Sequence, residues 1–145
     1  MSDLAYFATG CFWGAERRFW NLNGVTNTSV GYMGGATSNP TYEEVCYEET
    51  GHAEAVRVNF EENIITYKEL LNVFWSCHNP TTLNRQGPDI GKQYRSAIFY
   101  LNDKQRLEAE ESKKIMNEST FDNNIVTEIT KFNEFYLAEE YHQKY

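Results

Sequence analysis

Basic side chains and long apolar runs are both scarce in this sequence. The 145 residues include 13 lysines and arginines against 21 aspartates and glutamates, which gives a formal net charge of −8. A surface that binds phosphate groups needs an excess of positive charge, so we expect neither nucleic acid nor an anionic membrane as a partner. No apolar run approaches the roughly 20 residues that cross a bilayer, and no basic and apolar leader follows Met1. These absences favour a cytoplasmic protein.

Cysteine is also scarce, and its spacing argues against two kinds of site. Cys11, Cys46 and Cys77 are odd in number and far apart, with no Cys-x-x-Cys pair. This spacing favours free thiols in a reducing compartment over a disulfide framework. Together with the three histidines they lack the paired short spacing of zinc sites, so we expect no metal, and no cofactor is indicated. Without internal repeats, residues 1–145 are expected to form a single domain, with a monomer as the default.

One heptapeptide, Gly10–Glu16, stands out from this background. It follows an apolar run and precedes a helix-compatible run, which places Cys11 near the N-terminus of a helix. The unpaired backbone N–H groups there favour the thiolate, the nucleophilic form of cysteine. The alternative is a small buried hydrophobic residue, the usual state of a free cysteine. The flanking glycines and the aromatic pair Phe12 and Trp13 favour the reactive interpretation, because they leave room and an apolar wall beside the thiol.

The hydrophobic pattern predicts five strands and three helices. The expected strands are Leu4–Ala8, Asn27–Met33, Glu54–Phe60, Tyr94–Leu101 and Ile125–Thr130, and the expected helices are Ala15–Leu22, Thr66–His78 and Asp103–Asn117. Two long loops, residues 36–53 and 79–93, separate them, and the aromatic tail Phe132–Tyr145 is expected to pack across the body. This order indicates an α+β fold, a ferredoxin-like α/β plait. Its mixed sheet would carry helices mainly on one face, with long loops at the site.

The strand beginning at Glu54 gives that residue a particular environment. Side chains two apart in a strand share a face, so Glu54 lies on the side of the apolar residues Val56, Val58 and Phe60. A carboxyl group at the end of an apolar face is partly desolvated, which raises its pKa. Glu54 is therefore a candidate proton donor.

The loops hold the polar and aromatic residues that the core leaves over. Tyr42 and His52 lie in the first loop, and Asp89 and Tyr94 lie in or next to the second. We expect these side chains to converge with Cys11 at one site. His52 could then serve as the base of a Cys–His hydrolase, although one histidine is weak evidence for such a pair. A plait that only binds a ligand is the other alternative.

Several blocks of the sequence resemble one enzyme family. They are Gly10–Glu16, Gly31–Gly35, Asn39–Tyr42, Thr50–Val56, Asn84–Gly87, Gln93–Ser96 and Ala138–Gln143. In type and in order these blocks are similar to those of the A-type peptide methionine sulfoxide reductases, and they span nearly the whole chain. The resemblance implies reduction of methionine-S-sulfoxide, free or within proteins.

The same resemblance implies a role for each residue that matches a family position. Cys11 would be the nucleophile, Glu54 the acid that protonates the sulfoxide oxygen, Tyr42 and Tyr94 the phenols that hydrogen-bond this oxygen, Phe12 and Trp13 the pocket for the methyl group, and Asp89 a residue that places the substrate. Attack by Cys11 would leave it as a sulfenic acid. A thiol peroxidase using Cys11, or a non-catalytic plait that recognises methionine, are the rival interpretations.

The chain departs from the family pattern in two places. The family often has resolving cysteines in a C-terminal tail, whereas no cysteine follows Cys77 here. Cys46 is the better internal candidate for a resolving thiol, because it lies close in sequence to Tyr42 and Glu54. We nevertheless expect an external reductant, thioredoxin or glutaredoxin with glutathione. Asn79 stands before Pro80 where the family commonly has aspartate, a difference expected to be structural.

Overall fold

The computed structural model describes residues 2–48 and 50–144, so Met1, Glu49 and Tyr145 of the predicted domain and loop lie outside the described residues. The strands are β1 (Ser2–Thr9), β2 (Val25–Met33), β3 (Ala53–Glu61), β4 (Arg85–Gln86), β5 (Asp89–Ile90), β6 (Ser96–Tyr100), β7 (Glu128–Lys131) and β8 (Phe135–Leu137). The helices are α1 (Phe12–Trp20), α2 (Tyr42–Tyr47), α3 (Tyr67–Ser76) and α4 (Asp103–Ser119), with short 3₁₀ turns η1 (Lys92–Tyr94) and η2 (Glu140–His142). None of the helices in these described ranges is long and apolar enough to cross a membrane.

The main sheet is mixed, as predicted. Its strand order is β7-β6-β1-β3-β2-β8, and β4 pairs with β5 in a separate small ribbon. β1 runs antiparallel to β3 and β6, β2 runs antiparallel to β3 and β8, and β6 pairs with β7 in parallel. The predicted strand at Tyr94 begins only at Ser96, because Tyr94 belongs to η1.

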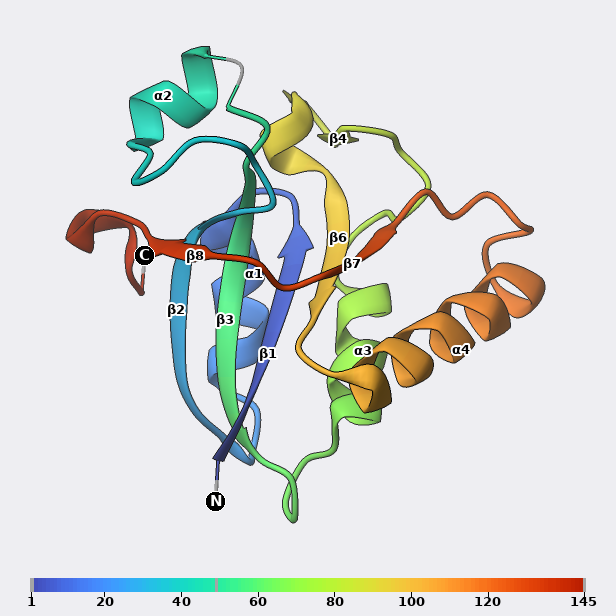
Figure 1. Cartoon of the computed structure of the whole chain (residues 1–145). Coiled ribbons are helices and arrows are strands. Elements are labelled where there is room, and N and C mark those ends of the chain that lie inside the picture. Colours follow the sequence, from blue (N-terminus) through green and yellow to red (C-terminus); the bar gives the residue numbers. More distant parts are fainter. Residues whose placement is uncertain (1, 49, 145) are drawn as a thin grey trace.

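The two faces of the sheet are covered by different elements. Alternation along β1 sends Phe7 toward α1 and α3, where its ring lies 5.2 Å from that of Phe19. It sends Tyr6 to the opposite face, against Phe132 and Phe135 of the C-terminal segment. In Figure 1, α1 lies behind the strands and the C-terminal segment crosses in front of them. The predicted packing of the tail across the body is confirmed.

Two of the predicted helices begin at side-chain caps. The Thr66 hydroxyl accepts a hydrogen bond from the Glu69 N–H at 3.1 Å, and the Glu69 carboxylate accepts one from the Thr66 N–H at 3.2 Å. This capping box starts α3, as the sequence predicted. α4 is capped by Asn102, whose side chain accepts from the Gln105 N–H at 2.9 Å, and not by Asp103 as predicted. Asp103 is instead the first helical residue.

The segment 36–53, predicted as a polar loop, contains a helix that was not predicted from the sequence. Thr41 and Glu44 form a capping box of the same kind as that of α3, and α2 follows it for six residues. Only Val45 of α2 is buried, so the helix has no apolar period to reveal it. The helix places Tyr42 and Cys46 one turn apart on the same side. The second loop likewise contains the β4–β5 ribbon, which holds Asp89.

Candidate active site

Cys11 lies at the junction between β1 and α1, as predicted. It is the N-cap residue of α1, and its carbonyl accepts a hydrogen bond from the Ala15 N–H at 3.2 Å. Its side chain is partly exposed, so the thiol can be reached from outside. The position near a helix N-terminus that the sequence indicated is therefore confirmed.

The protonation of Cys11 differs from the prediction. Burial raises the pKa of the Cys11 thiol above its ordinary value, and the charges of Glu54 and Asp89 raise it further. The backbone N–H groups of Trp13 and Gly14 lower the pKa, as expected of a helix N-terminus, but they do not outweigh burial. The expectation that the resting thiolate is favoured was wrong, and the resting form is a thiol.

Glu54 has the environment that the strand alternation predicted. It is 1% exposed, and burial raises its pKa to about 8. The Phe12 N–H donates a hydrogen bond to Oε1 at 3.1 Å and lowers the pKa, whereas the Asp89 charge raises it. The other oxygen, Oε2, is buried and has no hydrogen-bond partner among the described residues. Glu54 is therefore held at one oxygen, with a second oxygen left to exchange a proton.

The two long loops bring Tyr42, Cys46 and Tyr94 together. The hydroxyls of Tyr42 and Tyr94 both act on the Cys46 thiol and lower its pKa, although burial outweighs them. Burial raises the pKa of Tyr94 to about 12 and also raises the pKa values of Tyr42 and Cys46. The charge that Glu54 carries once it ionises raises the pKa values of all three groups further. The predicted convergence of the phenols with Glu54 is thus present, and Cys46 belongs to the same group of interacting side chains.

The aromatic pair that follows Cys11 is divided between surface and core. Trp13 is partly exposed, and its indole N–H donates a hydrogen bond to His142 Nδ1 at 3.0 Å. The Phe12 side chain is completely buried, with its ring 5.6 Å from Tyr32 and 5.2 Å from His142. Trp13 therefore offers the accessible part of the apolar wall, and Phe12 supports it from behind while its N–H holds Glu54.

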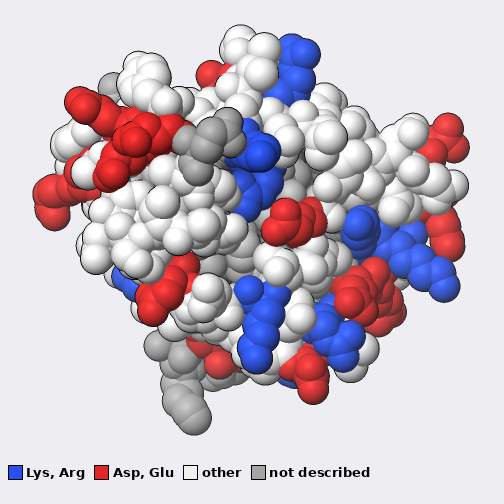
Figure 2. All heavy atoms as spheres, turned by 45° about the horizontal axis from the view of Figure 1, so that its top comes forward, with Lys and Arg blue, Asp and Glu red and all other residues white. Residues whose placement is uncertain are grey.

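Acidic residues shape the surroundings of the site. Asp89 in β5 is half-buried, and its charge acts on Cys11, Glu54 and Tyr94. Acidic side chains also gather over α2, which has Glu43 and Glu44 in its first turn (Figure 2). Like charge at this rim disfavours a phosphorylated ligand, in line with the expectation from composition.

His52 does not have the position of a catalytic base. It is 2% exposed, and its Nδ1 accepts a hydrogen bond from the Gly35 N–H at 3.1 Å. Its Nε2 then carries the proton and donates to the Thr37 carbonyl at 2.7 Å. Both ring nitrogens fix the loop backbone, so the Cys–His hydrolase alternative lacks its base.

Cys77 is the C-cap residue of α3, and its thiol donates to the Phe74 carbonyl at 3.4 Å. Burial raises the pKa of this thiol, which makes it a weak nucleophile.

Comparison with known families decides among the remaining chemistries. The family model described as peptide methionine sulfoxide reductase matches residues 3–145. The chain belongs to the peptide methionine sulfoxide reductase family. The resemblance carried by the sequence blocks is confirmed, and the enzyme class is an oxidoreductase that reduces methionine sulfoxide.

Relatives of this reductase match it over nearly its whole length. The peptide methionine sulfoxide reductase MsrA of Methanosarcina acetivorans is 57% identical over 144 residues, which cover 99% of this chain and 77% of the relative. Mxr1 from Saccharomyces cerevisiae in reduced form has a TM-score of 0.94 and 37% identity, covering 99% of this chain and 83% of that chain. Mxr1 in complex with Trx2 has a TM-score of 0.72 and 28% identity, covering 96% and 82% respectively.

Two residues that line the site of this reductase, Glu139 and His142, had no predicted role. Glu139 accepts hydrogen bonds from the Tyr42 N–H at 3.0 Å and from the Tyr32 hydroxyl at 2.9 Å. His142 accepts from Trp13 and packs its ring 4.6 Å from that of Tyr42. The block Ala138–Gln143 was the available signal, because it resembled the family without having an assigned function.

Proposed function

We propose that this protein reduces the S epimer of methionine sulfoxide, free or within proteins, with Cys11 as the nucleophile. The observation that supports this most directly is the carboxyl of Glu54, kept neutral by burial and with one buried oxygen unpartnered. A sulfoxide sulfur becomes electrophilic when its oxygen receives a proton, and such a carboxyl supplies one at neutral pH.

The residues divide the chemical step between them. Cys11 sulfur forms a bond to the substrate sulfur as its own proton leaves, while Glu54 gives a proton to the sulfoxide oxygen. Tyr42 and Tyr94 donate hydrogen bonds to that oxygen as its charge develops. The hydroxyl then passes from the substrate sulfur to the Cys11 sulfur: the bond between oxygen and the substrate sulfur breaks, a bond between oxygen and the Cys11 sulfur forms, and the sulfur–sulfur bond breaks as the sulfide leaves as methionine. The proton lost by Cys11 restores the neutral carboxyl of Glu54. Cys11 becomes a sulfenic acid, so methionine is reduced and Cys11 is oxidised by the same two electrons.

Substrate placement is assigned to the remaining site residues. Trp13, supported by Phe12, is proposed to face the methyl group, since a polarisable aromatic wall suits a methylsulfur group. Asp89 is proposed to help orient the substrate through its charge, because it is half-buried and acts on both Cys11 and Glu54.

We propose that an external thiol system regenerates Cys11. Two thiols reduce the sulfenic acid to a thiol and water and become a disulfide, and thioredoxin or glutaredoxin with glutathione supplies them. Thioredoxin is supported by the similarity to Mxr1, which forms a complex with Trx2. Cys46 is the internal candidate for a resolving thiol. Its raised pKa makes it a slow nucleophile, which supports the external route.

A single-turnover experiment tests this function. Reduced protein is mixed with a peptide that contains methionine-S-sulfoxide, without added thiol. About one equivalent of the sulfoxide should be converted to methionine within the peptide, and Cys11 should become a sulfenic acid. Cys11→Ser should convert none, whereas Cys77→Ser should match the wild type. A thiol titration then separates the recycling routes. Loss of one free thiol supports the external route, and loss of two that is prevented by Cys46→Ser assigns Cys46 as a resolving thiol.

The rival functions give different results in the same assay. Consumption of hydrogen peroxide without methionine release would favour a thiol peroxidase. Tight retention of the peptide with neither product would favour a binding module.

We also propose a fold type, a single domain, a cellular compartment and an oligomeric state for this protein. The order β6-β1-β3-β2, with α1 and α3 as connections, supports a ferredoxin-like plait within one domain, residues 1–145. The three free cysteines support a reducing compartment such as the cytoplasm. A monomer is proposed, and its mass in solution tests this directly.

A further inference from the structure

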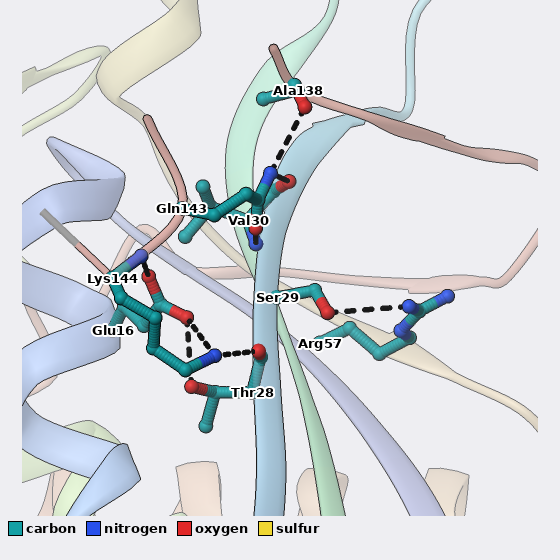
Figure 3. A network of polar contacts seen from close by, with 8 residues as sticks. All are labelled: Glu16, Thr28, Ser29, Val30, Arg57, Ala138, Gln143 and Lys144. Atoms are coloured by element: carbon teal, nitrogen blue, oxygen red, sulfur yellow. Dashed lines mark hydrogen bonds and ion pairs between the residues drawn. The ribbon is translucent and has the colours of Figure 1, made fainter. Parts of the chain in front are cut away.

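The C-terminal strap, defined as Ala138–Lys144, is fixed firmly to the body. The Val30 N–H donates to the Gln143 side-chain oxygen at 2.8 Å, and the Gln143 amide donates to the Val30 carbonyl at 2.9 Å. The Lys144 N–H donates to the buried carboxylate of Glu16 at 2.7 Å. Figure 3 shows these contacts between the strap, β2 and α1. The strap is thereby held against both elements, and Glu16 belongs to the same heptapeptide as the nucleophile.

Glu139, which precedes these anchors in the strap, contacts the part of the site that would bind the sulfoxide oxygen. One carboxylate oxygen accepts from the N–H of Tyr42, the first residue of α2, and the other accepts from the Tyr32 hydroxyl. Burial acts to raise the pKa of Glu139, but these hydrogen bonds keep the pKa below its ordinary value. An ionised Glu139 therefore fixes the backbone from which the Tyr42 phenol projects.

His142 reaches the other part of the site, the aromatic wall. It is 1% exposed, and burial lowers its pKa, although the charge of Glu139 opposes this. A neutral imidazole whose Nδ1 accepts from Trp13 has its proton on Nε2. That Nε2 is buried and has no hydrogen-bond partner among the described residues.

His142 also contacts both halves of the site at once. Its ring lies 5.5 Å from Trp13, 5.2 Å from Phe12 and 4.6 Å from Tyr42. We propose that His142 and Glu139 are positioning residues that hold Trp13 and Tyr42 in one arrangement around Cys11, an inference that rests on the proposed function. The strap thereby joins the wall for the methyl group to the phenol for the oxygen.

The first test measures the Trp13 indole N–H in the protein without substrate. Nitrogen–proton NMR resolves the three tryptophan side chains, and a Trp13→Phe variant assigns the signal. His142→Asn and His142→Leu have nearly equal size, but only asparagine keeps an acceptor close to the position of Nδ1. The Trp13 N–H should exchange slowly in wild type and in His142→Asn, and quickly in His142→Leu. Equal exchange in the two variants, or rapid exchange in the wild type, would overturn the role of His142.

Kinetics with a methionine-S-sulfoxide peptide give the second test. His142→Leu should have a KM about fivefold above that of His142→Asn at similar kcat, the usual effect of one neutral hydrogen bond that orients bound substrate. Glu139→Gln should lower kcat about tenfold with a smaller change in KM, because the Tyr42 phenol acts on the reacting oxygen. Glu140→Gln removes the same charge from the exposed neighbouring residue and should equal the wild type.

Equal kcat for Glu139→Gln and Glu140→Gln would contradict the role of Glu139. If neither the wild type nor any variant reduces the peptide sulfoxide to methionine, the proposed function is wrong. The NMR comparison still decides whether His142 positions Trp13.

Discussion

At the residue scale, the site depends on a carboxyl group that burial keeps neutral. Glu54 is almost fully buried, and burial raises its pKa to about 8, with the Asp89 charge acting in the same direction. Ionisation would place an uncompensated charge beside Val56 and the other buried side chains of β3. The burial on which the proposed role of Glu54 as a proton donor rests therefore also makes its ionised form costly to the folded state.

This cost predicts a pH-dependent effect of Glu54→Gln on stability. The unfolded pKa is near 4.5 and the folded pKa near 8, so the folded state binds more protons in this window. The contribution of Glu54 to the free energy of unfolding is fully present below pH 4.5. It declines between pH 4.5 and pH 8, by about 1.4 kcal/mol per pH unit at most. Glu54→Gln should therefore gain stability relative to the wild type as the pH rises from 5 to 8, measured by urea unfolding.

The exposed Glu118 provides the control for this prediction. Glu118→Gln removes a carboxyl from the surface of α4 and should follow the pH dependence of the wild type. A constant difference in unfolding free energy between Glu54→Gln and wild type across this window would mean that Glu54 titrates normally in the fold.

The sequence predicted Glu54 well and Cys11 only in part, for a physical reason. The face on which Glu54 lies follows from alternation within one strand, which is local information. The pKa of Cys11 is set by burial and by Glu54 and Asp89, which come from distant parts of the chain. The helix N-terminus beside Cys11 was visible in the sequence, but burial, the largest effect on the pKa, and the two distant charges were not.

At the element scale, α2 and the strap both carry residues of the site, and neither element shows a periodic pattern of hydrophobic residues that would predict it from the sequence. The six residues of α2 bury only Val45, although the capping box of Thr41 and Glu44 was present in the sequence and could have indicated a helix. The strap is held mainly by polar contacts to Val30 and Glu16. Such contacts join residues far apart in sequence, so their partners cannot be deduced from spacing.

The strap predicts a measurable cost for removing its last described side chain. Lys144 Nζ lies 3.1 Å from a carboxylate oxygen of Glu16 and also contacts the Thr28 carbonyl. Glu16 is completely buried, whereas the Lys144 side chain is about half exposed, so solvent screens the pair in part. Lys144→Met should lower the free energy of unfolding by about 1–2 kcal/mol, measured by urea unfolding, because it leaves Glu16 less well compensated.

Lys114→Met is the matched control, since Lys114 is exposed on α4. It should change the unfolding free energy by less than about 0.5 kcal/mol. If Lys144→Met were no less stable than Lys114→Met, the ion pair with Glu16 would contribute nothing to docking of the strap.

At the scale of the whole molecule, the antiparallel sheet gathers the site at one end. β1 ends where β6 begins, with Thr9 opposite Ser96, and β2 ends where β3 begins, with Met33 opposite Ala53. Cys11, Tyr42 and Tyr94, which lie on the connections, and Glu54 at the start of β3 therefore come together at the same end of the sheet, the upper end in Figure 1. The mixed sheet could be predicted because hydrophobic residues recur clearly with the periods of strands and helices. The convergence of the loops at one end follows from the topology of that sheet.

The proposed reaction depends on one proton, which Glu54 holds close enough to Cys11 to affect the pKa of its thiol. The pH dependence of kcat/KM for a methionine-S-sulfoxide peptide, in wild type and Glu54→Gln, tests this most directly. The reactive pair needs a thiolate and a protonated carboxyl, so the wild-type value should fall on the alkaline side of pH 8 as the pair loses its last proton. The kcat/KM of Glu54→Gln should be about a hundredfold lower than that of the wild type at the wild-type pH optimum. With rising pH it should increase to a plateau as Cys11 ionises. An unchanged kcat/KM in Glu54→Gln, or the same alkaline fall in both proteins, would contradict the role of Glu54 as the proton donor.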